Sequence, residues 1–329
     1  MEFRILGPIE VWSERRQIAL GGVKQRALLA VLLLHRNEVV SIDRLIDELW
    51  NGHPPATSVK VVQVYVSQLR KALGGRRARS DEEGLLVTRA PGYLLRVEPD
   101  ELDAERFERL VEEGRRALGE GSPRLATRTL LEALALWRGP ALADFALDSF
   151  AQTEIARLEE VRVSAVADRI DADLALARHE ELVSELEALV AENPLRERLR
   201  GQLMLALYRA SRQADALEVY RQTRELLRAE LGLEPTKALQ LLERSILQQD
   251  TALELGARPF VVGSADDDGG VVVCPFKGLA FFDVADAPTN ERALGSSAVS
   301  WSRIERSSDC RALLGSSPSS PCRSSLVWR

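Results

Sequence analysis

The clearest hydrophobic pattern in the chain runs from Thr57 to Leu73, where apolar residues recur every three to four positions. At roughly 100° per residue, one side of a helix with this sequence carries the apolar residues Val59, Val62, Val66, Leu69 and Leu73. The opposite side carries Lys60, Val64, Ser67, Gln68 and Lys71. The spacing predicts an amphipathic helix with one buried stripe and one exposed face that is rich in hydrogen-bond donors.

The same stretch has a competing interpretation as a strand, because it is dense in β-branched residues, which lose rotamer freedom in helices. The helix is favoured by the length of the run, by the helix-forming residues 68–73, and by the terminator Gly74-Gly75. Val64 also has two interpretations, as an exposed contact residue or as a side chain packed on the preceding turn.

Short elements precede and follow this helix. Residues 3–20 alternate loosely between apolar and polar and predict short antiparallel strands. Residues 27–34 predict a strongly apolar helix, and residues 42–50 predict another, with Ser41 as its cap and Asn51-Gly52 as its stop.

Alternation resumes between Leu85 and Val97, on either side of Ala90-Pro91-Gly92. This pattern predicts a hairpin in which Pro91 sets one turn position and Gly92 supplies a positive φ at the next. A sheet, three helices and a terminal hairpin predict an α+β winged helix-turn-helix domain over residues 1–98, in which the third helix enters the DNA major groove.

From residue 99 to 250 the composition shifts to Leu, Ala, Glu and Arg with persistent helical periodicity, which predicts an all-α domain. Two segments, beginning at Ala177 and Ala210, align Arg178 with Arg212 at a spacing of 34 residues. This is the tetratricopeptide period, so we expect helix pairs that stack and offer a surface to partners.

Residues 251–329 have the composition of a linker and a disordered tail. An Asp- and Gly-rich stretch covers residues 261–272, and residues 296–329 contain 12 Ser in 34 positions without sustained periodicity.

Charge separates the predicted domains. The whole chain has a formal net charge of −6, but residues 1–98 hold 15 Lys and Arg against 11 Asp and Glu. No acidic residue occurs between Glu48 and Asp81. That gap contains the cations Lys60, Arg70, Lys71, Arg76, Arg77 and Arg79. A basic segment in an acidic protein favours binding to nucleic acid phosphates at a defined site.

Several classes of protein are disfavoured. The three cysteines all follow residue 273, which fits a reducing cytoplasm, and the longest apolar run, Ala27 to Leu34, is far shorter than the ~20 residues that span a bilayer. The histidines show no metal-binding spacing, and no nucleophile elbow or dinucleotide-binding turn occurs. We therefore expect a cytoplasmic protein without a membrane segment, metal or cofactor, and without enzymatic activity.

Several longer motifs carry a family resemblance. The stretches FRILGPIEVW, GGVKQRALLAVLLLHRNEVVSIDRLIDELW, VVQVYVSQLRKAL and TRAPGYLL closely resemble the DNA-binding domain of the SARP family of transcriptional activators. The stretches FERLVEEGRRAL, EALALWRGPALADF, NPLRERLRGQLMLALYR and GLEP are similar to that family's bacterial transcriptional activator domain. Together these matches cover about residues 1–250.

The resemblance implies an activator of antibiotic biosynthesis clusters that binds promoter direct repeats as a dimer and recruits RNA polymerase. By similarity to response-regulator output domains, the base-facing residues are Lys60, Val64 and Gln68. The same similarity assigns phosphate contacts to Trp50, Ser67 and Arg70, and places Arg89 and Tyr93 in the wing. Trp50 also has a packing interpretation, in which it closes the core between two helices.

Residues 274–287 are similar to the start of the signalling NTPase domain found in large members of this family. The phosphate-binding loop that should follow is replaced by a Ser- and Pro-rich stretch, so we expect a remnant of a truncated or frame-shifted regulator. The alternative to a DNA-binding activator is a protein-interaction scaffold whose winged helix binds protein.

Overall fold

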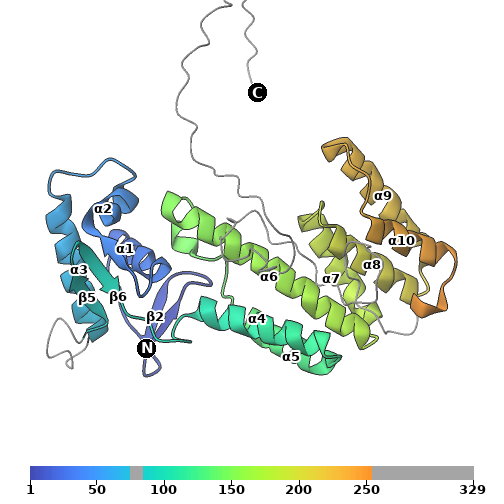
Figure 1. The fold of residues 1–329 in the computed structure, drawn as a ribbon, viewed down its shortest axis with the longest axis horizontal. Helices are drawn as coiled ribbons and strands as arrows, with labels where there is room; N and C mark the ends of the chain where they lie inside the picture. The colour runs from blue at the N-terminus through green and yellow to red at the C-terminus, as the bar shows by residue number, and fades with distance from the viewer. Residues whose placement is uncertain (75–83, 254–329) are drawn as a thin grey trace, which may run out of the picture. The chain divides into compact units, whose positions relative to one another are not determined.

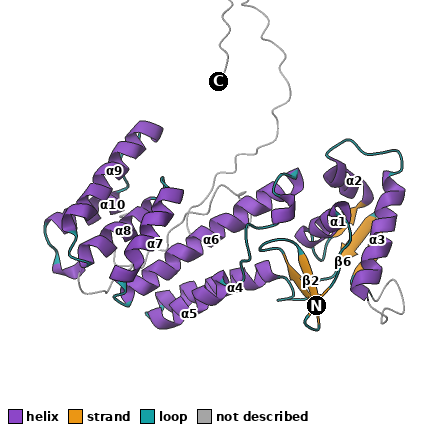
Figure 2. Ribbon diagram, turned by 180° about the vertical axis from the view of Figure 1, so that it is seen from behind, coloured by secondary structure: helices purple, strands orange, loops and turns teal. Residues whose placement is uncertain are grey.

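The structure is a computed structural model that describes residues 1–74 and 84–253. Every strand among these described residues lies in the first 95 positions, together with three helices. All the regular elements that follow are helices (Figure 1). The predicted α+β winged helix followed by an all-α tetratricopeptide-like region is confirmed, and the colouring by secondary structure shows the division clearly (Figure 2). Two predicted features, the basic cluster Arg76, Arg77 and Arg79 and the tail from residue 254 onward, lie outside the described residues.

The chain begins with the expected antiparallel sheet. It consists of β1 (Glu2–Arg4), β2 (Glu10–Ser13) and β3 (Arg16–Gln17), in the order β1-β2-β3. Phe3 pairs with Val11 across β1 and β2, and both side chains are fully buried. The sheet therefore presents one apolar face to the core.

Three helices follow, α1 (Val23–Leu34), α2 (Ile42–Trp50) and α3 (Ser58–Gly74). The hydroxyl of Ser41 accepts a hydrogen bond from the Arg44 amide (3.2 Å) and caps α2, and Asn51 ends it in the left-handed conformation, as predicted. The strand interpretation of α3 is wrong, because burial of its apolar stripe outweighs the weak helix propensity of its valines.

The wing belongs to a second sheet. Strands β5 (Leu86–Arg89) and β6 (Gly92–Leu95) form the predicted hairpin, and β6 also pairs with β4 (Val39–Ser41), which the sequence analysis did not predict. A three-residue strand is too short to show alternation, so only its pairing with β6 identifies it.

Two local expectations are corrected. Val59 is 44% exposed rather than buried, because it lies in the first turn of α3, where nothing packs over it. Gly92 does not adopt a positive φ. It is required because a Cβ there would lie 1.8 Å from the Val40 carbonyl oxygen, so only glycine lets β6 approach β4.

The helical region contains the α-helices α4 (Asp103–Gly119), α5 (Pro123–Leu134), α6 (Ser149–Ala175), α7 (His179–Glu192), α8 (Glu197–Arg209), α9 (Gln213–Leu231) and α10 (Lys237–Leu247). Short 3-10 turns occur at η1 (Ala143–Phe145) and η2 (Thr251–Leu253). The Leu253 carbonyl accepts a hydrogen bond from Arg209 (2.7 Å), so contacts with the helical region continue past residue 250.

Three helix pairs share one turn geometry. Gly121, Ala177 and Ser211 adopt positive φ between α4 and α5, α6 and α7, and α8 and α9. The amide that follows each of them bonds the carbonyl five residues earlier, as in Arg178 to Asp173 (3.1 Å) and Arg212 to Leu207 (2.9 Å). The predicted 34-residue spacing therefore corresponds to equivalent turns, and α4–α5 is a further pair that the sequence comparison missed.

Hydrophobic packing does not break at the predicted domain boundary. One core joins Phe3 and Leu28 of the winged helix to Phe107, Leu130 and Leu158 of α4, α5 and α6. A second core begins at Ala167 and includes residues of α6 through α10. The long helix α6 therefore contributes to both cores.

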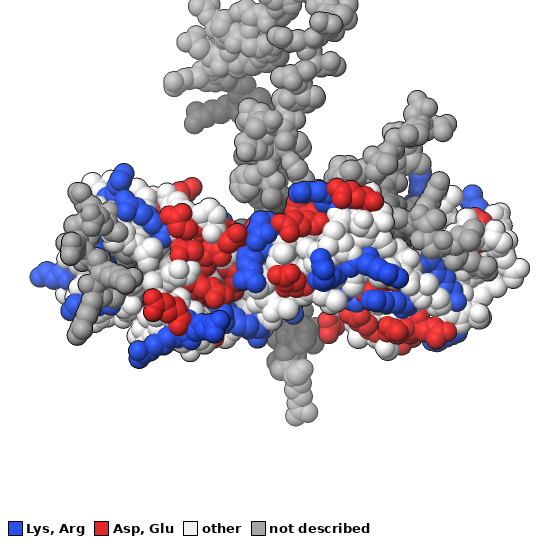
Figure 3. Space-filling view, turned by 90° about the horizontal axis from the view of Figure 1, so that it is seen from below, with Lys and Arg blue, Asp and Glu red and all other residues white. Residues whose placement is uncertain are grey.

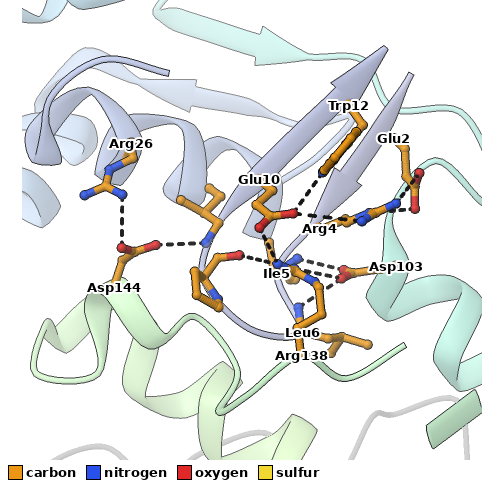
Figure 4. Close-up of polar contacts among 12 residues, drawn as sticks. Glu2, Arg4, Ile5, Leu6, Glu10, Trp12, Arg26, Asp103, Arg138 and Asp144 are labelled. Carbon is orange, nitrogen blue, oxygen red and sulfur yellow. Dashed lines mark hydrogen bonds and ion pairs between the residues drawn. The ribbon is translucent and has the colours of Figure 1, made fainter. Parts of the chain in front are cut away.

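Two carboxylates connect the β1–β2 loop to the helical region (Figure 4). Asp103 accepts hydrogen bonds from the amides of Ile5 (2.8 Å) and Leu6 (3.1 Å), and Asp144 accepts one from the Ile9 amide (2.8 Å). Burial raises the pKa of Asp103, an effect that the two amides partly oppose. These contacts hold the first sheet against the start of α4 and the η1 turn.

Candidate nucleic-acid interface

The exposed face of α3 is the centre of the candidate site. Lys60, Val64, Ser67, Gln68 and Lys71 are all exposed, and the side chain of Val64 is 51% exposed. Half of the Val64 surface is thus open to a partner, as its interpretation as a contact residue requires. Neither Lys60 nor Lys71 forms an ion pair with a residue that the structure describes.

The opposite face fixes the orientation of the helix. Val62, Val66, Leu69 and Leu73 are buried, each between 0% and 4% exposed, and they pack into the core formed with α1 and α2. Full burial of such a side chain contributes about 1.5–3 kcal/mol. Because the buried residues form one stripe along α3, their packing turns the opposite, donor-bearing face of the helix toward solvent.

The approach to α3 is set by the end of α2. Asn51 and Gly52 both adopt positive φ and turn the chain, and the Lys24 ammonium of α1 donates a hydrogen bond to the Leu49 carbonyl at the C-terminal end of α2. Trp50 is half-buried and packs against the core, as its packing interpretation states.

Arg70 connects α3 to the wing. Its Nε donates to the Leu86 carbonyl (2.9 Å) and its Nη2 donates to the Thr88 hydroxyl (2.6 Å), both on β5. Its guanidinium lies 6.0 Å from the centre of the Tyr93 ring, which is only 6% exposed. Arg70 and Tyr93 therefore fix the position of the wing relative to α3.

Arg89, by contrast, is exposed at the end of β5, next to the exposed turn Ala90-Pro91. Because α3 and β5 are in contact, the tip of the wing and the outer face of α3 belong to adjoining elements (Figure 1). The predicted residues therefore divide into two groups. Lys60, Val64, Ser67, Gln68, Lys71 and Arg89 are exposed, whereas Trp50, Arg70 and Tyr93 are partly or fully packed.

The sequence analysis missed one residue of this face. Gln63 is exposed, three positions after Lys60 and four before Ser67, so it lies on the same side of α3. Its helical spacing relative to Lys60 and Ser67 is the signal that places it on this face.

Charge distinguishes this face from the helical region. The described residues 51–74 and 84–97 contain no Asp or Glu. Over the helical region, the view in Figure 3 shows patches of both signs lying side by side. A cationic surface next to a mixed one is suited to a polyanion that docks on one side only.

No cluster of three or more His, Cys, Asp or Glu residues in the described part of the chain is arranged to hold a metal ion. None of the described helices is both long and apolar enough to cross a bilayer. Burial lowers the pKa of His35, and the positive charge of the neighbouring Arg44 lowers it further.

Two family profiles match the chain. One, described as "Transcriptional regulatory protein, C terminal", matches residues 16–95, and the other, described as "Bacterial transcriptional activator domain", matches residues 102–247. The fold and this pairing of domains define a winged-helix transcriptional regulator with an attached helical activator domain.

Known relatives identify the family. The chain is 38% identical over 257 residues to regulatory protein DnrI of Streptomyces peucetius, a match that covers 77% of this chain and 94% of DnrI. It is 41% identical over 305 residues to regulatory protein AfsR of Streptomyces coelicolor, a match that covers 90% of this chain but 30% of AfsR. The chain thus spans less than a third of the length of that relative. It belongs to the SARP family of transcriptional regulators.

A solved structure shows the same fold. "Mycobacterium tuberculosis EmbR in complex with low affinity phosphopeptide" matches with a TM-score of 0.71 and 36% sequence identity. The match covers 77% of this chain and 68% of the EmbR chain.

Proposed function

We propose that this regulator is a cytoplasmic, sequence-specific DNA-binding activator that controls an antibiotic biosynthesis cluster and has no catalytic step of its own. The observation that carries the proposal is the outer face of α3, where hydrogen-bonding and cationic side chains are exposed together and no acidic residue accompanies them. Membership of a transcriptional regulator family supports it.

The side chains match the chemistry of the major groove. The Gln68 amide can donate and accept at an adenine edge, the Lys60 ammonium can donate to guanine, and Val64 can contact a thymine methyl group. Gln63 adds a second amide on the same face. In this proposal these residues read bases, so their loss changes the preferred sequence.

Ser67, Lys71 and Arg89 contact phosphates in the proposal, because they flank the base-reading stripe on α3 and at the tip of the wing. Arg70, Tyr93 and Trp50 support this arrangement from within. Arg70 in particular has donors engaged by Leu86 and Thr88, so it positions the wing against α3.

Two partners complete the proposal. Two copies of the chain bind tandem direct repeats as a dimer, and the helical region supplies the surface that recruits RNA polymerase. The resemblance to the SARP family supports both partners.

The test is a fluorescence anisotropy titration of the full chain on duplexes selected from random DNA, with salt varied. We expect Gln68→Ala to lose about 1–3 kcal/mol on the selected site and little on scrambled DNA. Lys71→Ala should weaken binding to both and reduce the salt slope by about 0.9. Arg124→Ala, at an exposed arginine in the first turn of α5, is the matched control and should change neither.

Absence of binding to any duplex in low-salt buffer contradicts the proposal. If the Gln68 and Lys71 variants weaken all sequences equally, the division into base and phosphate contacts is wrong. If the α3 variants release a protein partner and leave DNA binding unchanged, the scaffold interpretation replaces the proposal.

A further inference from the structure

A pocket of about 440 Å³ lies between α7, α8 and α9, away from the α3 face. Apolar side chains line much of it, contributed by Val190 of α7, Leu203 and Leu207 of α8, and Val219 of α9. One charged side chain from the first turn of α8, Arg200, also lines it.

Arg200 is buried without a counter-ion. The residue is 7% exposed, and its Nε donates to the Pro194 carbonyl (2.7 Å) while its Nη1 donates to the Thr223 hydroxyl (3.2 Å). Both acceptors are neutral. Within residues 84–253, no carboxylate lies within ion-pair distance of this guanidinium, and its Nη2 has no hydrogen-bond acceptor.

Among the described residues, the other arginine in the buried class does have counter-ions. Arg169 is 8% exposed and is neutralised by Asp173 and Glu185. Arg200 has no such partner, and burial lowers its pKa with no neighbouring charge to oppose the shift. An uncompensated buried cation opposes folding, whereas an anion that enters the pocket would relieve the cost.

The charges around the pocket restrict the anion. Asp215 is paired with Arg212 (2.6 Å), and Glu218 is held by Arg221 and Gln222, and neither carboxylate forms an ion pair with Arg200. Glu187 also lines the pocket. Apart from Arg200, the lining therefore holds three carboxylates and one cation, Arg212. This excess of negative charge disfavours polyanions and favours a ligand with one negative charge and an apolar body.

We propose that this pocket binds a carboxylate carried on an apolar chain, with Arg200 holding the carboxylate and Leu203, Leu207 and Val219 packing on the apolar part. The planar guanidinium can present two parallel N–H groups to a carboxylate, a geometry that a lysine cannot offer. A free medium-chain acid and the C-terminal end of an apolar peptide supply the same chemistry. The inference does not depend on the proposed DNA binding, because the pocket lies on different helices.

The test uses the full chain and calorimetric titration with three probes of the same carbon number, namely octanoate, octanol and octylammonium. We expect octanoate to bind at least about tenfold more tightly than octanol, and octylammonium not to bind. Acetyl-trileucine with a free carboxyl end, compared with its amide, shows whether a peptide terminus is the better source.

Two variants test whether Arg200 causes the preference for octanoate. Arg200→Met keeps an unbranched apolar stem but removes the guanidinium and its charge, and it should abolish the preference for octanoate over octanol while circular dichroism remains native. Arg209→Met is the matched control, because Arg209 is also desolvated but donates to the Leu174 and Leu253 carbonyls outside the pocket. It should keep the preference.

A readout on the unmodified protein covers the case in which the methionine variant does not fold. The ¹⁵Nε resonance of Arg200 should shift when octanoate is added and not when octanol is added. Equal binding of octanoate to the Arg200→Met variant, absence of the shift, or failure of every acid to bind at millimolar concentration overturns the proposal.

Discussion

The winged helix and the helical region use charged residues in opposite ways. On α3 and the wing, Lys60, Lys71 and Arg89 are exposed in segments that contain no acidic residue among those the structure describes. On α6, Asp168, Asp171 and Asp173 are buried, and arginines reach them from α4, from α8 and from the turn between α6 and α7.

The contacts on α6 show what the second arrangement does. Asp168 accepts from Arg115 of α4 and from Arg198 of α8 (2.6 Å each), and Asp173 accepts from Thr127 of α5 (3.1 Å). Each buried charge thus joins neighbouring helix pairs. Buried ion pairs contribute more to unique packing than to net stability, because desolvation offsets much of their attraction.

This difference between α3 and α6 relates the environment of each charged residue to its structural or binding role. Where helices must pack in one register, each buried carboxylate has a cationic partner within the fold. Where a polyanion is the proposed partner, the described segments that carry the cations contain no acidic residue, and binding of the polyanion relieves the mutual repulsion of the cations.

The largest expected effect is loss of a buried charge from α6. Asp168→Asn should lower the free energy of unfolding by about 3 kcal/mol, the low end for a broken buried ion pair, because Arg198 keeps its contact with Asp171. Urea denaturation followed by circular dichroism measures it. Glu185→Gln, at the exposed partner of Arg169, should change stability by less than about 1 kcal/mol. Equal losses of stability from the two variants would show that burial of the carboxylate does not determine how much an ion pair contributes.

A smaller effect is expected at the boundary between α3 and the wing. Arg70→Met should lower the free energy of unfolding by about 1–2 kcal/mol, because it removes two hydrogen bonds to β5 and leaves the Leu86 carbonyl without this donor.

Hydrogen exchange separates this role from a direct DNA contact. If Arg70 positions the wing, the β5 and β6 amides of the Arg70→Met protein should exchange faster even without DNA. Unchanged exchange with weakened DNA binding would instead make Arg70 a phosphate contact. Lys71→Met on the same helix is the control and should leave exchange as it is.

The smallest effect concerns an exposed ion pair in the helical region. The hydrogen bond from Arg196 lowers the pKa of Glu160 below its ordinary value of 4.5, although burial opposes the shift. A carboxyl whose folded pKa is lowered stabilises the fold above its unfolded pKa and loses that contribution as the pH falls through the folded pKa. Glu160→Gln should therefore cost about 0.2–1 kcal/mol at pH 7, and the difference should shrink below about pH 4.5. A difference that persists in acid would indicate a packing effect instead.

Local sequence determined much of this protein, because its strongest signals are carried by residues within one or two turns of one another. The stripe Val62, Val66, Leu69 and Leu73 defines α3, Ser41 and Asn51 delimit α2, and the spacing between Arg178 and Arg212 marks equivalent turns. The separation of a basic front from an acidic remainder can also be read from composition alone.

Tertiary structure decided the features that depend on distant partners. Strand β4 exists because β6 pairs with it, Gly92 is required because the Val40 carbonyl lies against it, and Val59 is exposed because no element covers the first turn of α3. Arg70 and Arg200 look alike in sequence, yet one bonds to the wing and the other is buried beside a pocket. Hydrophobic periodicity depends on residues that are close together along the chain, so it can be read from the sequence. The partners of a charged side chain depend on how elements far apart in sequence pack together, so only the tertiary structure determines them.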